Sequence, residues 1–454
     1  MFDLSNELEE FLNEEVVLSD KEQKKLKRLR KININRLKAG LKEYNEEKGT
    51  NYRIIHDIIQ GSAQMYTVIQ KEQKDYDVDV AIVFDEENIS DISAITIRRI
   101  VKEALAKNTK QFNAQPEVKT SCVRLHYAEG YHIDFAIFKR TKDMFNHYGY
   151  EHAGADWTKR DIKGVENWFN IENQNSSGLL RKVVRLSKQM CNTRLNMPSG
   201  LIQTALCAEM LYQSDRLDIA LYETIKRIKT RLDGYTRVTI PVDNNRSLTD
   251  RLVDVERVLK YKNLLSNALS KLEVLEKYGC TRADALAAWG AVFNHEYWND
   301  SLNESMQQNS SLAVRDSHLP VKYSHTEEFI EDKYFINDPE EVELKTTVTN
   351  IPGFRDMPLD EYLLRNTPRL RHGVKIKCEL QGNKYYDYDY LLWKVRNVGK
   401  LAKQNDMIRG QIIKRGSCIT EPCSFYGDHY IECYLIKNEQ CIAIGHVDIP
   451  IGEK

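Results

Sequence analysis

The sequence contains no apolar run long enough to span a membrane, and its N-terminus lacks the basic and then apolar order of a signal peptide. Its 66 basic and 67 acidic residues give a formal net charge of −1, which excludes a globally basic nucleic-acid binder but allows a local basic pocket for phosphates. Nine cysteines scattered over 454 residues exclude a disulfide framework and are typical of reduced thiols. These absences predict a cytoplasmic protein with no membrane partner and no requirement for nucleic-acid binding.

The chain is long enough for two or three domains, and 41% hydrophobic with 29% charged residues is an ordinary globular composition. Changes in composition and in hydrophobic periodicity along the chain predict an α+β protein in four parts. These are a sheet-containing core with N-terminal helices over 1–175, a helical lobe over 176–302, a polar linker over 303–334 and a β-rich domain over 335–454.

The local patterns place several elements. Ser19 and Glu22 form a capping-box pattern ahead of a long helix, and a second helix is expected over 92–106. Strands are expected over 118–126 and 132–138. The stretch 179–295 is almost wholly helical in pattern, with Pro198 opening one helix. Alternating residues predict further strands at 374–378, 386–395, 411–413, 430–436 and 441–447.

The motif Asp77-Val78-Asp79 directly precedes the apolar run 80–84, which reads as a buried strand. Side chains two residues apart in a strand share a face at about 6.5–7 Å, so both carboxylates can converge on one metal site. A third carboxylate is expected from a neighbouring strand, and Asp134 within 132–138 fits that position. An ordinary turn is the alternative, because Asp favours strand ends. Asp75 also shares the register, so spacing alone does not force the pair.

A glycine-serine turn, Gly61-Ser62, comes between an apolar strand pattern at 54–59 and this acidic strand. Glycine lets the backbone approach a phosphate closely, and the neighbouring amides and hydroxyl are donors. The dipeptide carries no signal alone, but a phosphate-binding turn followed by paired acids is what metal-dependent nucleotidyl transfer requires.

Arg181, Arg185 and Lys188 fall on one face of a predicted helix. Such a stripe could bind a triphosphate, and a solvated basic face is the simpler interpretation. Ser199 follows Pro198 at an expected helix start, where an anion site and an ordinary N-terminal cap fit equally well.

Two patterns in the last domain have simple explanations. The gaps between Cys418, Cys423, His429 and Cys433 are looser than those of compact zinc sites, so metal binding is not favoured. The alternating tyrosines at 386, 388 and 390 indicate a strand with one aromatic face, with base stacking as the alternative.

The ordered set Gln60-Gly61-Ser62, Thr67, Asp77-Val78-Asp79 and Asp134 resembles that of the DNA polymerase β-like nucleotidyltransferases. More narrowly, residues 1–300 resemble the bacterial cGAS/DncV-like enzymes (CD-NTases) of anti-phage CBASS operons. The C-terminal part resembles the sensor-type domain called AGS-C, on Trp393-Lys394-Val395-Arg396-Asn397 and the segment 427–432. One departure is Tyr66, which stands where the family often has glycine and predicts a less permissive turn.

The resemblance implies specific roles. Asp77, Asp79 and Asp134 would hold two Mg²⁺ or Mn²⁺ ions, and Asp134 would help to draw the proton from the acceptor hydroxyl. Gln60, Gly61 and Ser62, with Lys188 and Ser199, would bind the donor nucleotide. The implied activity is synthesis of a cyclic di- or trinucleotide messenger from NTPs, ATP among them, which acts on a downstream effector.

Two other functions fit the same residues. The chain could make linear oligonucleotides or add nucleotides to a nucleic acid or a protein hydroxyl. It could also be an inactive nucleotide-binding regulator, although a degenerate enzyme is free to lose the three acids that are present here.

Overall fold

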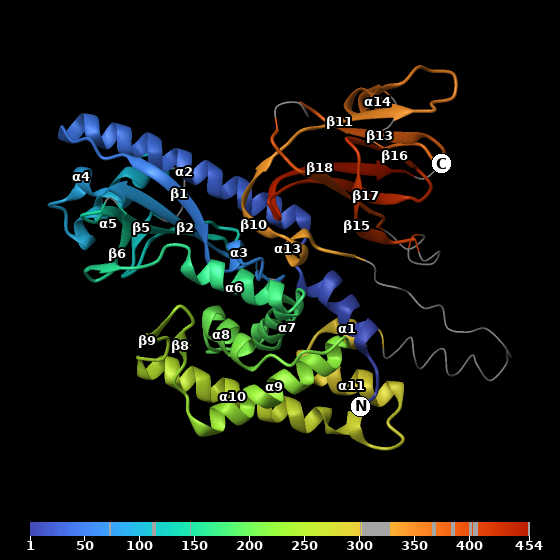
Figure 1. Ribbon diagram of the computed structural model, residues 1–454, viewed down its shortest axis with the longest axis horizontal. Coiled ribbons are helices and arrows are strands. Elements are labelled where there is room, and N and C mark those ends of the chain that lie inside the picture. The colour runs from blue at the N-terminus through green and yellow to red at the C-terminus, as the bar shows by residue number, and fades with distance from the viewer. Residues whose placement is uncertain are drawn as a thin grey trace. The chain divides into compact units, whose positions relative to one another are not determined.

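The computed structural model describes residues 1–454 except 72–73, 111–114, 146, 300, 302–326, 366–368, 383–385, 399–401, 403–406 and 453–454, and the side chains of all but three of the rest. The chain folds as two compact units, Met1–Gln308 and Asn309–Lys454 (Figure 1). Most of the predicted linker lies outside the described residues. The division of the first unit into a core and a lobe remains a prediction.

The first unit combines one large sheet with many helices. Its helices are α1 Ser5–Phe11, η1 Leu12–Val16, α2 Asp20–Lys48, α3 Gly61–Gln64, α4 Glu86–Ile89, α5 Ala94–Lys107, α6 Gly164–Asn175, α7 Leu179–Asn192, α8 Gly200–Met210, α9 Leu217–Gly234, α10 Leu252–Leu272, η2 Glu273–Glu276 and α11 Arg282–Phe293. Its strands are β1 Ile54–Gln60, β2 Asp77–Asp85, β3 Glu117–Val118, β4 Val123–His126, β5 His132–Lys142, β6 Tyr148–Ala153, β7 Trp157–Lys159, β8 Thr239–Ile240 and β9 Asp243–Ser247.

The large sheet has the order β1-β2-β5-β4-β3, and β6 pairs with both β5 and β7. β2 and β5 run parallel, whereas β1 pairs antiparallel with β2. The long strand β5 changes neighbours along its length, because β4 pairs with its first half and β6 with its second half. The polar end of β5 therefore lies between β2 and β4.

Alternation along the strands separates two faces of this sheet. One face packs on α2 and α5 in a core that includes Val78, Val80, Ile82, Phe84, Ile133, Phe135 and Ile137 (Figure 1). A smaller cluster on the other face contains Ala81, Val83, Phe138 and Ile162. Because side chains alternate along a strand, the odd-numbered positions of β2 and the even-numbered positions of β5 point away from α2 and α5.

The predicted long helix is α2, and Ser19 caps it by accepting a hydrogen bond from the Glu22 amide at 3.4 Å. The Glu22 carboxylate accepts from the Tyr131 hydroxyl and from Lys74 instead of returning to the cap. Only half of the capping box therefore forms. The Glu22 side chain instead connects α2 to Tyr131, the residue before β5.

Three local expectations were wrong. The strand expected over 118–126 is a hairpin of β3 and β4, because residues between them turn the chain. The stretch 179–295 includes the hairpin β8–β9 as well as helices. Pro198 does not open α8, because Ser199 is its N-terminal cap and the helix begins at Gly200.

The N-terminal helix α1 packs on the helical part of the first unit and not on the sheet. The Phe11 ring lies 4.8 Å from that of Phe293 in α11, and the Phe2 amide donates to the Leu275 carbonyl at 2.9 Å. The ring of Trp298 stacks on Phe293 at 5.8 Å. Aromatic packing thus joins the first helix to the last helices of the unit, far from it in sequence.

The second unit is built from two sheets around one apolar core. Its elements are α13 Ile330–Lys333, β10 Phe335–Glu341, β11 Leu344–Thr349, β12 Met357–Pro358, α14 Leu359–Arg365, β13 Lys375–Leu380, β14 Tyr390–Arg396, β15 Arg409–Arg415, β16 Cys418–Pro422, β17 Gly427–Lys437 and β18 Gln440–Ile451. One sheet has the order β10-β18-β17-β14-β15 and the other β12-β11-β13-β16. Buried residues of both sheets share one core, with Val348, Ile376, Trp393 and Leu435 among them.

His429, from the cysteine–histidine pattern of this unit, is held by the backbone. Both ring nitrogens of His429 bind backbone groups, since Nδ1 accepts from the Val398 amide at 2.9 Å and Nε2 lies 2.7 Å from the Phe425 carbonyl. The nine cysteines are free thiols. The tyrosines at 386 and 388 precede β14, which begins at Tyr390, so they do not form one aromatic strand face as predicted. Among the helices that the structure describes, none is both long and apolar enough to cross a membrane.

Candidate active site

The three predicted acids lie on one face of the large sheet, opposite to α2 and α5. The parallel pairing of β2 with β5 places Asp79 directly beside Asp134, and Asp77 beside His132. The antiparallel pairing of β1 with β2 places Gln60 beside Asp79 on the other side. Three adjacent strands therefore present Gln60, Asp79 and Asp134 in one row across the sheet.

The turn after β1 is shaped around Asp79. Gly61 has φ +67°, and a Cβ atom there would lie 2.4 Å from Asp79 Oδ2. The Gly61 amide donates to Glu166 Oε1 at 2.9 Å, while Gln60 Nε2 donates to the Ile162 carbonyl at 2.7 Å. Only glycine lets the backbone approach the carboxylate this closely, and the close approach to a phosphate that the dipeptide pattern predicts stays a prediction.

Ser62 lies in the short helix α3, immediately after Gly61. Its carbonyl accepts a hydrogen bond from the Thr67 amide at 2.9 Å. This bond closes the loop 65–67, which follows α3 and whose carbonyls accept hydrogen bonds from α7.

Electrostatics at this end of the sheet favour cations. Burial raises the pKa of Asp79 to about 7, with further contributions from the negative charges of Asp134 and Asp77. Burial also raises the pKa of Glu166. A carboxyl group that holds its proton this tightly is short of compensating positive charge.

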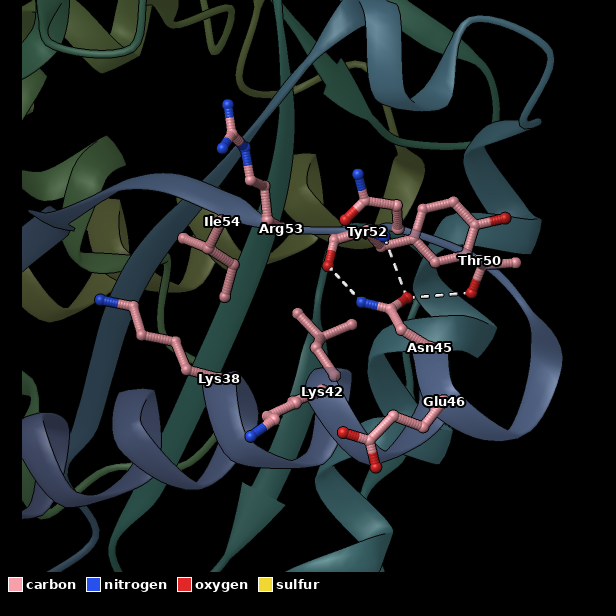
Figure 2. Close-up of a pocket in the computed structure, with 10 residues that line it drawn as sticks. Lys38, Lys42, Asn45, Glu46, Thr50, Tyr52, Arg53 and Ile54 are labelled. Atoms are coloured by element: carbon pink, nitrogen blue, oxygen red, sulfur yellow. Dashed lines mark hydrogen bonds between the residues drawn. The ribbon is translucent and has the colours of Figure 1, made fainter.

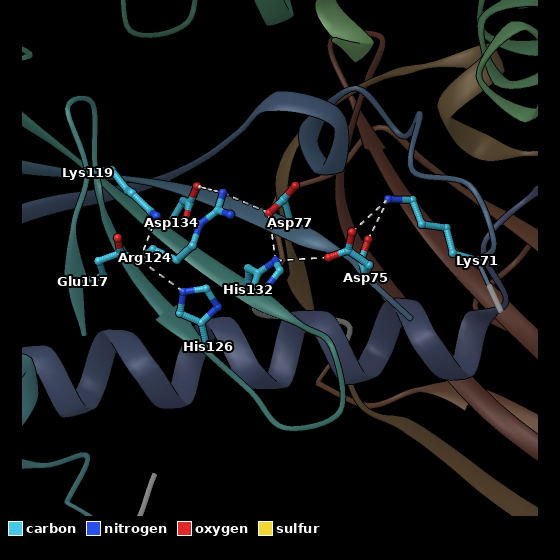
Figure 3. A network of polar contacts seen from close by, with 9 residues as sticks. All are labelled: Lys71, Asp75, Asp77, Glu117, Lys119, Arg124, His126, His132 and Asp134. Carbon is cyan, nitrogen blue, oxygen red and sulfur yellow. Dashed lines mark hydrogen bonds and ion pairs between the residues drawn. The ribbon is translucent and has the colours of Figure 1, made fainter. Parts of the chain in front are cut away.

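Arg124 is a central residue of the site that the sequence motifs did not reveal. It lies on β4 opposite Asp134, to which its Nε and Nη2 atoms donate two hydrogen bonds of 2.7 Å. The same Nη2 atom lies 3.2 Å from Asp77 Oδ1, so one guanidinium joins two of the three acids (Figure 3). A signal was present in the turn that ends at Gly130, because a hairpin centred on Glu129 places Arg124 beside Asp134.

His132 extends the same network. Its Nδ1 atom lies 3.2 Å from Asp75 Oδ1 and 3.3 Å from Asp77 Oδ1 (Figure 3). Asp75 precedes β2 and also lies 4.0 Å from Lys71 Nζ. Asp75 therefore belongs to the margin of the site, while Asp77 and Asp79 are in the strand.

The basic face of α7 binds the backbone of the loop after α3. Arg181 Nε donates to the Met65 carbonyl at 3.0 Å, and Arg185 Nε donates to the Tyr66 carbonyl at 2.9 Å. Both arginines are buried, so the solvated-face interpretation is wrong for them. They hold the loop by two successive carbonyls.

Tyr66 has φ +53°, so the loop keeps the left-handed backbone that glycine would adopt most easily. The expectation that tyrosine makes this turn less permissive is compatible with the strain of that conformation. The bond from Arg185 helps to hold the residue there.

Lys188 continues this series at the next carbonyl. Its ammonium donates to the Thr67 carbonyl at 2.9 Å and to Thr67 Oγ1 at 2.8 Å. A Cβ atom at Gly200 would lie 3.4 Å from Lys188 Nζ, so the ammonium lies beside the first residue of α8. Burial lowers the pKa of Lys188 to about 7. An anion bound nearby would favour the charged ammonium and raise this pKa.

Ser199 is the N-terminal cap of α8, and its Oγ accepts from the Ile202 amide at 3.4 Å. The cap interpretation therefore holds, and the exposed side chain lies next to the helix residue that Lys188 approaches. A role in anion binding remains a prediction.

The chemistry of the donor set fits hard divalent cations, because carboxylate oxygens are the ligands that Mg²⁺ and Mn²⁺ prefer. The raised pKa of Asp79 is the supporting observation. In the part of the chain that the structure describes, no group of three or more Asp, Glu, His or Cys side chains is already arranged around a common metal position. Arg124 Nη2 lies between Asp134 and Asp77, at 2.7 Å from one carboxylate and 3.2 Å from the other.

A separate open cavity of about 420 Å³ lies at the start of β1, the opposite end of that strand from Gln60 (Figure 2). α2 forms one wall with Lys38, Lys42 and Glu46, and the segment 50–54 forms the other. Asn45 ties the walls together by donating to the Tyr52 carbonyl at 2.8 Å. This cavity shares no lining residue with the acidic site.

Two known families match separate parts of the chain. Residues 56–138 match the family described as cyclic GMP-AMP synthase DncV-like, nucleotidyltransferase domain. Residues 324–452 match the adenylyl/guanylyl and SMODS C-terminal sensor domain, AGS-C. The first range contains the three acids and the Gly61 turn.

Several solved structures have a similar fold. Vibrio cholerae DncV cyclic AMP-GMP synthase, described as a prokaryotic cGAS homolog, is 18% identical, with 62% of this chain and 93% of that chain covered and a TM-score of 0.50. The same enzyme with the linear intermediate 5′ pppA(3′,5′)pG is 20% identical, with 64% and 95% covered and a TM-score of 0.51. Escherichia coli DncV with 3′-deoxy GTP is 18% identical, with 66% and 99% covered and a TM-score of 0.53. The predicted α+β fold, with a nucleotidyltransferase sheet and a C-terminal β-rich domain, is confirmed.

Proposed function

We propose that this chain, which carries a DncV-like nucleotidyltransferase domain and a C-terminal AGS-C sensor domain, joins NTPs into a cyclic oligonucleotide and releases pyrophosphate. ATP is proposed as one substrate, and the product as a cyclic di- or trinucleotide. This messenger would act in the cytoplasm on a downstream effector in anti-phage defence.

One observation carries the proposal. Asp79 and Asp134 are direct neighbours on parallel strands, and Asp77 lies on the same face of the sheet next to them. The backbone turn at Gly61 lies against the Asp79 carboxylate. Paired acids beside a close backbone approach are suited to neutralising the charge of a transferring nucleotide.

Asp77, Asp79 and Asp134 would hold two divalent cations, Mg²⁺ or Mn²⁺. When bound, such ions activate an attacking hydroxyl and neutralise a leaving pyrophosphate. Asp134 would also help to draw the proton from the acceptor hydroxyl, since it lies directly beside Asp79 in the row of acids.

The other predicted residues would position the donor nucleotide. Gly61 keeps the backbone close to Asp79. Ser62, the next residue, would place its hydroxyl and amide beside the phosphates. Lys188 lies at the first residue of α8, where Ser199 forms the cap. A lysine ammonium and a helix N-terminus together favour a triphosphate. Gln60 would support the turn through its bond to the Ile162 carbonyl.

The cyclic product is proposed from the relatives. The Vibrio cholerae protein of the same fold is a cyclic AMP-GMP synthase, and one of its structures contains a linear intermediate. A linear intermediate that stays bound can be closed by a second transfer at the same acids. This order of events needs no second catalytic site.

The test is to incubate the full chain with all four NTPs and Mg²⁺ or Mn²⁺ and to identify products by mass spectrometry. A phosphatase-resistant cyclic product containing adenosine is expected. A product that phosphatase degrades would show linear synthesis instead. NTP binding with no pyrophosphate release under either metal would overturn the proposal.

A matched pair of variants makes this test specific. Asp79→Asn should abolish product formation, because the amide removes one of the charges at the site. Asp85→Asn changes the same residue type at the other end of β2, where the carboxylate pairs with Arg140 at 2.7 Å. The second variant should retain activity. Loss of activity in both would point to a general defect of the strand.

A further inference from the structure

Arg124 and Asp134 form a doubly hydrogen-bonded charge pair at the acidic end of the sheet. Both oxygens of Asp134 accept from the guanidinium, each at 2.7 Å. This fork matches a carboxylate in geometry and is among the strongest charge-assisted arrangements. The hydrogen bonds to Asp134 also raise the pKa of Arg124.

The guanidinium also reaches the second acid. Its Nη2 atom lies 2.7 Å from Asp134 Oδ2 and 3.2 Å from Asp77 Oδ1, so a single nitrogen lies between two of the predicted metal ligands (Figure 3). A divalent cation shared by the same two carboxylates would have to occupy much of the same space. The positive charges cannot both be close to these oxygens without strong repulsion.

We infer that Arg124 is an internal counter-ion that holds Asp77 and Asp134 before metal binding and competes with the divalent cation for them. This inference rests on the proposed function, because it takes the acids to be metal ligands. Arg124 is thus a positioning residue: it keeps two carboxylates close despite their mutual repulsion, and it must withdraw when the cation binds.

The charges at the site explain why Arg124 would act in both the metal-free and the metal-bound protein. Three carboxylates on one face repel each other, since Asp79 lies directly beside Asp134 and Asp77 lies on the same face. Arg124 supplies one compensating charge in the metal-free protein. After the cation replaces it, the released guanidinium is free to pair with a phosphate of the bound nucleotide, which would couple metal binding to substrate binding.

The experiment measures Mn²⁺ binding to the full-length, metal-free protein without nucleotide, by electron paramagnetic resonance of the free ion. Arg124→Gln should bind Mn²⁺ about tenfold more tightly than the unmodified protein, because the competing charge is gone. Arg124→Lys keeps the charge but loses the fork, so its affinity should lie between the two. Unchanged or weaker Mn²⁺ binding by Arg124→Gln in a folded protein would overturn the inference.

Two controls separate competition from general effects of charge. Arg140 pairs with Asp85 at the other end of β2 and β5, with contacts of 2.9 and 2.7 Å. Lys119 belongs to the same polar network and pairs with Glu117 at 2.7 Å (Figure 3). Arg140→Gln and Lys119→Gln should change Mn²⁺ affinity less than twofold. A tenfold increase with Lys119→Gln would show that any nearby cation has this effect, and would reject direct competition.

This measurement is independent of turnover. If no cyclic product forms but Arg124→Gln strengthens Mn²⁺ binding, the proposed reaction fails while the competition stands. If product forms and the affinity does not increase, only the role of Arg124 fails. Thermal unfolding of each variant without metal establishes that the protein measured is folded.

Discussion

Gly61 and Asp79 are fitted to each other across the turn that follows β1. The position that a Gly61 Cβ atom would occupy lies 2.4 Å from Asp79 Oδ2, well inside any van der Waals contact. The left-handed backbone at Gly61, with φ +67°, is also one that glycine adopts at little cost. The absence of a side chain at residue 61 therefore leaves room for the Asp79 carboxylate.

Gly61→Ala should reduce product formation roughly 100-fold, because the added methyl displaces the Asp79 carboxylate from its position. Initial rates of pyrophosphate release measure this loss. Gly49→Ala is the matched control, since Gly49 has φ +66° and no atom lies within 4 Å of the place that its new methyl would take. The control should lose about 1–2 kcal/mol of stability from backbone strain and keep its activity. Equal loss of activity in both variants would contradict the steric argument.

Asp79→Asn should stabilise the metal-free protein while it abolishes turnover. The folded pKa of about 7 lies above the usual value of 3.8, so the folded state binds the proton more tightly than the unfolded state. The contribution of Asp79 to stability is therefore complete below about pH 4 and is lost as the pH rises to about 7. Neutral asparagine avoids this loss, which we place at roughly 2–4 kcal/mol at pH 8.

The measurement is thermal unfolding in EDTA at pH 5 and pH 8. The difference in Tm between Asp79→Asn and the unmodified protein should grow with pH. A difference that is constant, or that shrinks toward pH 8, would show that Asp79 is not the group responsible.

Lys188 should take up a proton when an NTP binds at pH 8. Burial lowers its pKa to about 7, so most of the amine is neutral in the free protein at this pH. A nearby triphosphate favours the charged form and raises that pKa, so close to one proton is bound per nucleotide. Calorimetry in buffers of different ionisation enthalpy, at a fixed Mg²⁺ concentration, measures the uptake.

Two variants at this position make the result specific. Lys188→Met should bind NTP more weakly and lose the proton uptake. Lys188→Arg keeps a permanent charge, so it should bind NTP without taking up the proton. Uptake that persists in both variants would assign the proton to another group.

Glu327 should be a major source of stability in the second unit. Burial alone would raise the pKa of its carboxyl, but Lys394 and Arg396 outweigh this and lower it. The carboxylate lies 2.8 Å from Lys394 Nζ and 3.1 Å from Arg396 Nε, and it accepts from the Tyr430 hydroxyl at 3.0 Å. Glu327→Ala would leave Lys394 buried without its carboxylate, at a cost of about 3–5 kcal/mol.

Chemical denaturation followed by tryptophan fluorescence measures this loss, because Trp393 lies in the core of this unit. Glu379→Ala is the control, since Glu379 pairs with Lys377 at 2.8 Å on the protein surface. An exposed pair contributes at most about 1 kcal/mol. A comparable loss of stability in the two variants would reject the role of the buried pair.

Covalent geometry and local periodicity decided much of this protein from the sequence alone. The two-residue alternation of a strand put Asp77 and Asp79 on one face, and serine at position 19 capped α2. The order of the sequence also pointed to the Gly61-Ser62 turn before the acidic strand and to Asp134 in the next apolar strand. These features depend on residues that are close in sequence or on a motif order that survives at low identity.

Only the tertiary structure decided which charges meet. Asp79 lies beside Asp134 because β2 and β5 pair in parallel in one register, and Arg124 meets both Asp134 and Asp77 because β4 joins the far side of β5. The arginines of α7 were expected to face solvent or phosphate, but folding placed them against loop carbonyls. The register between β2 and β5 depends on how the whole core packs, so no local pattern contains it.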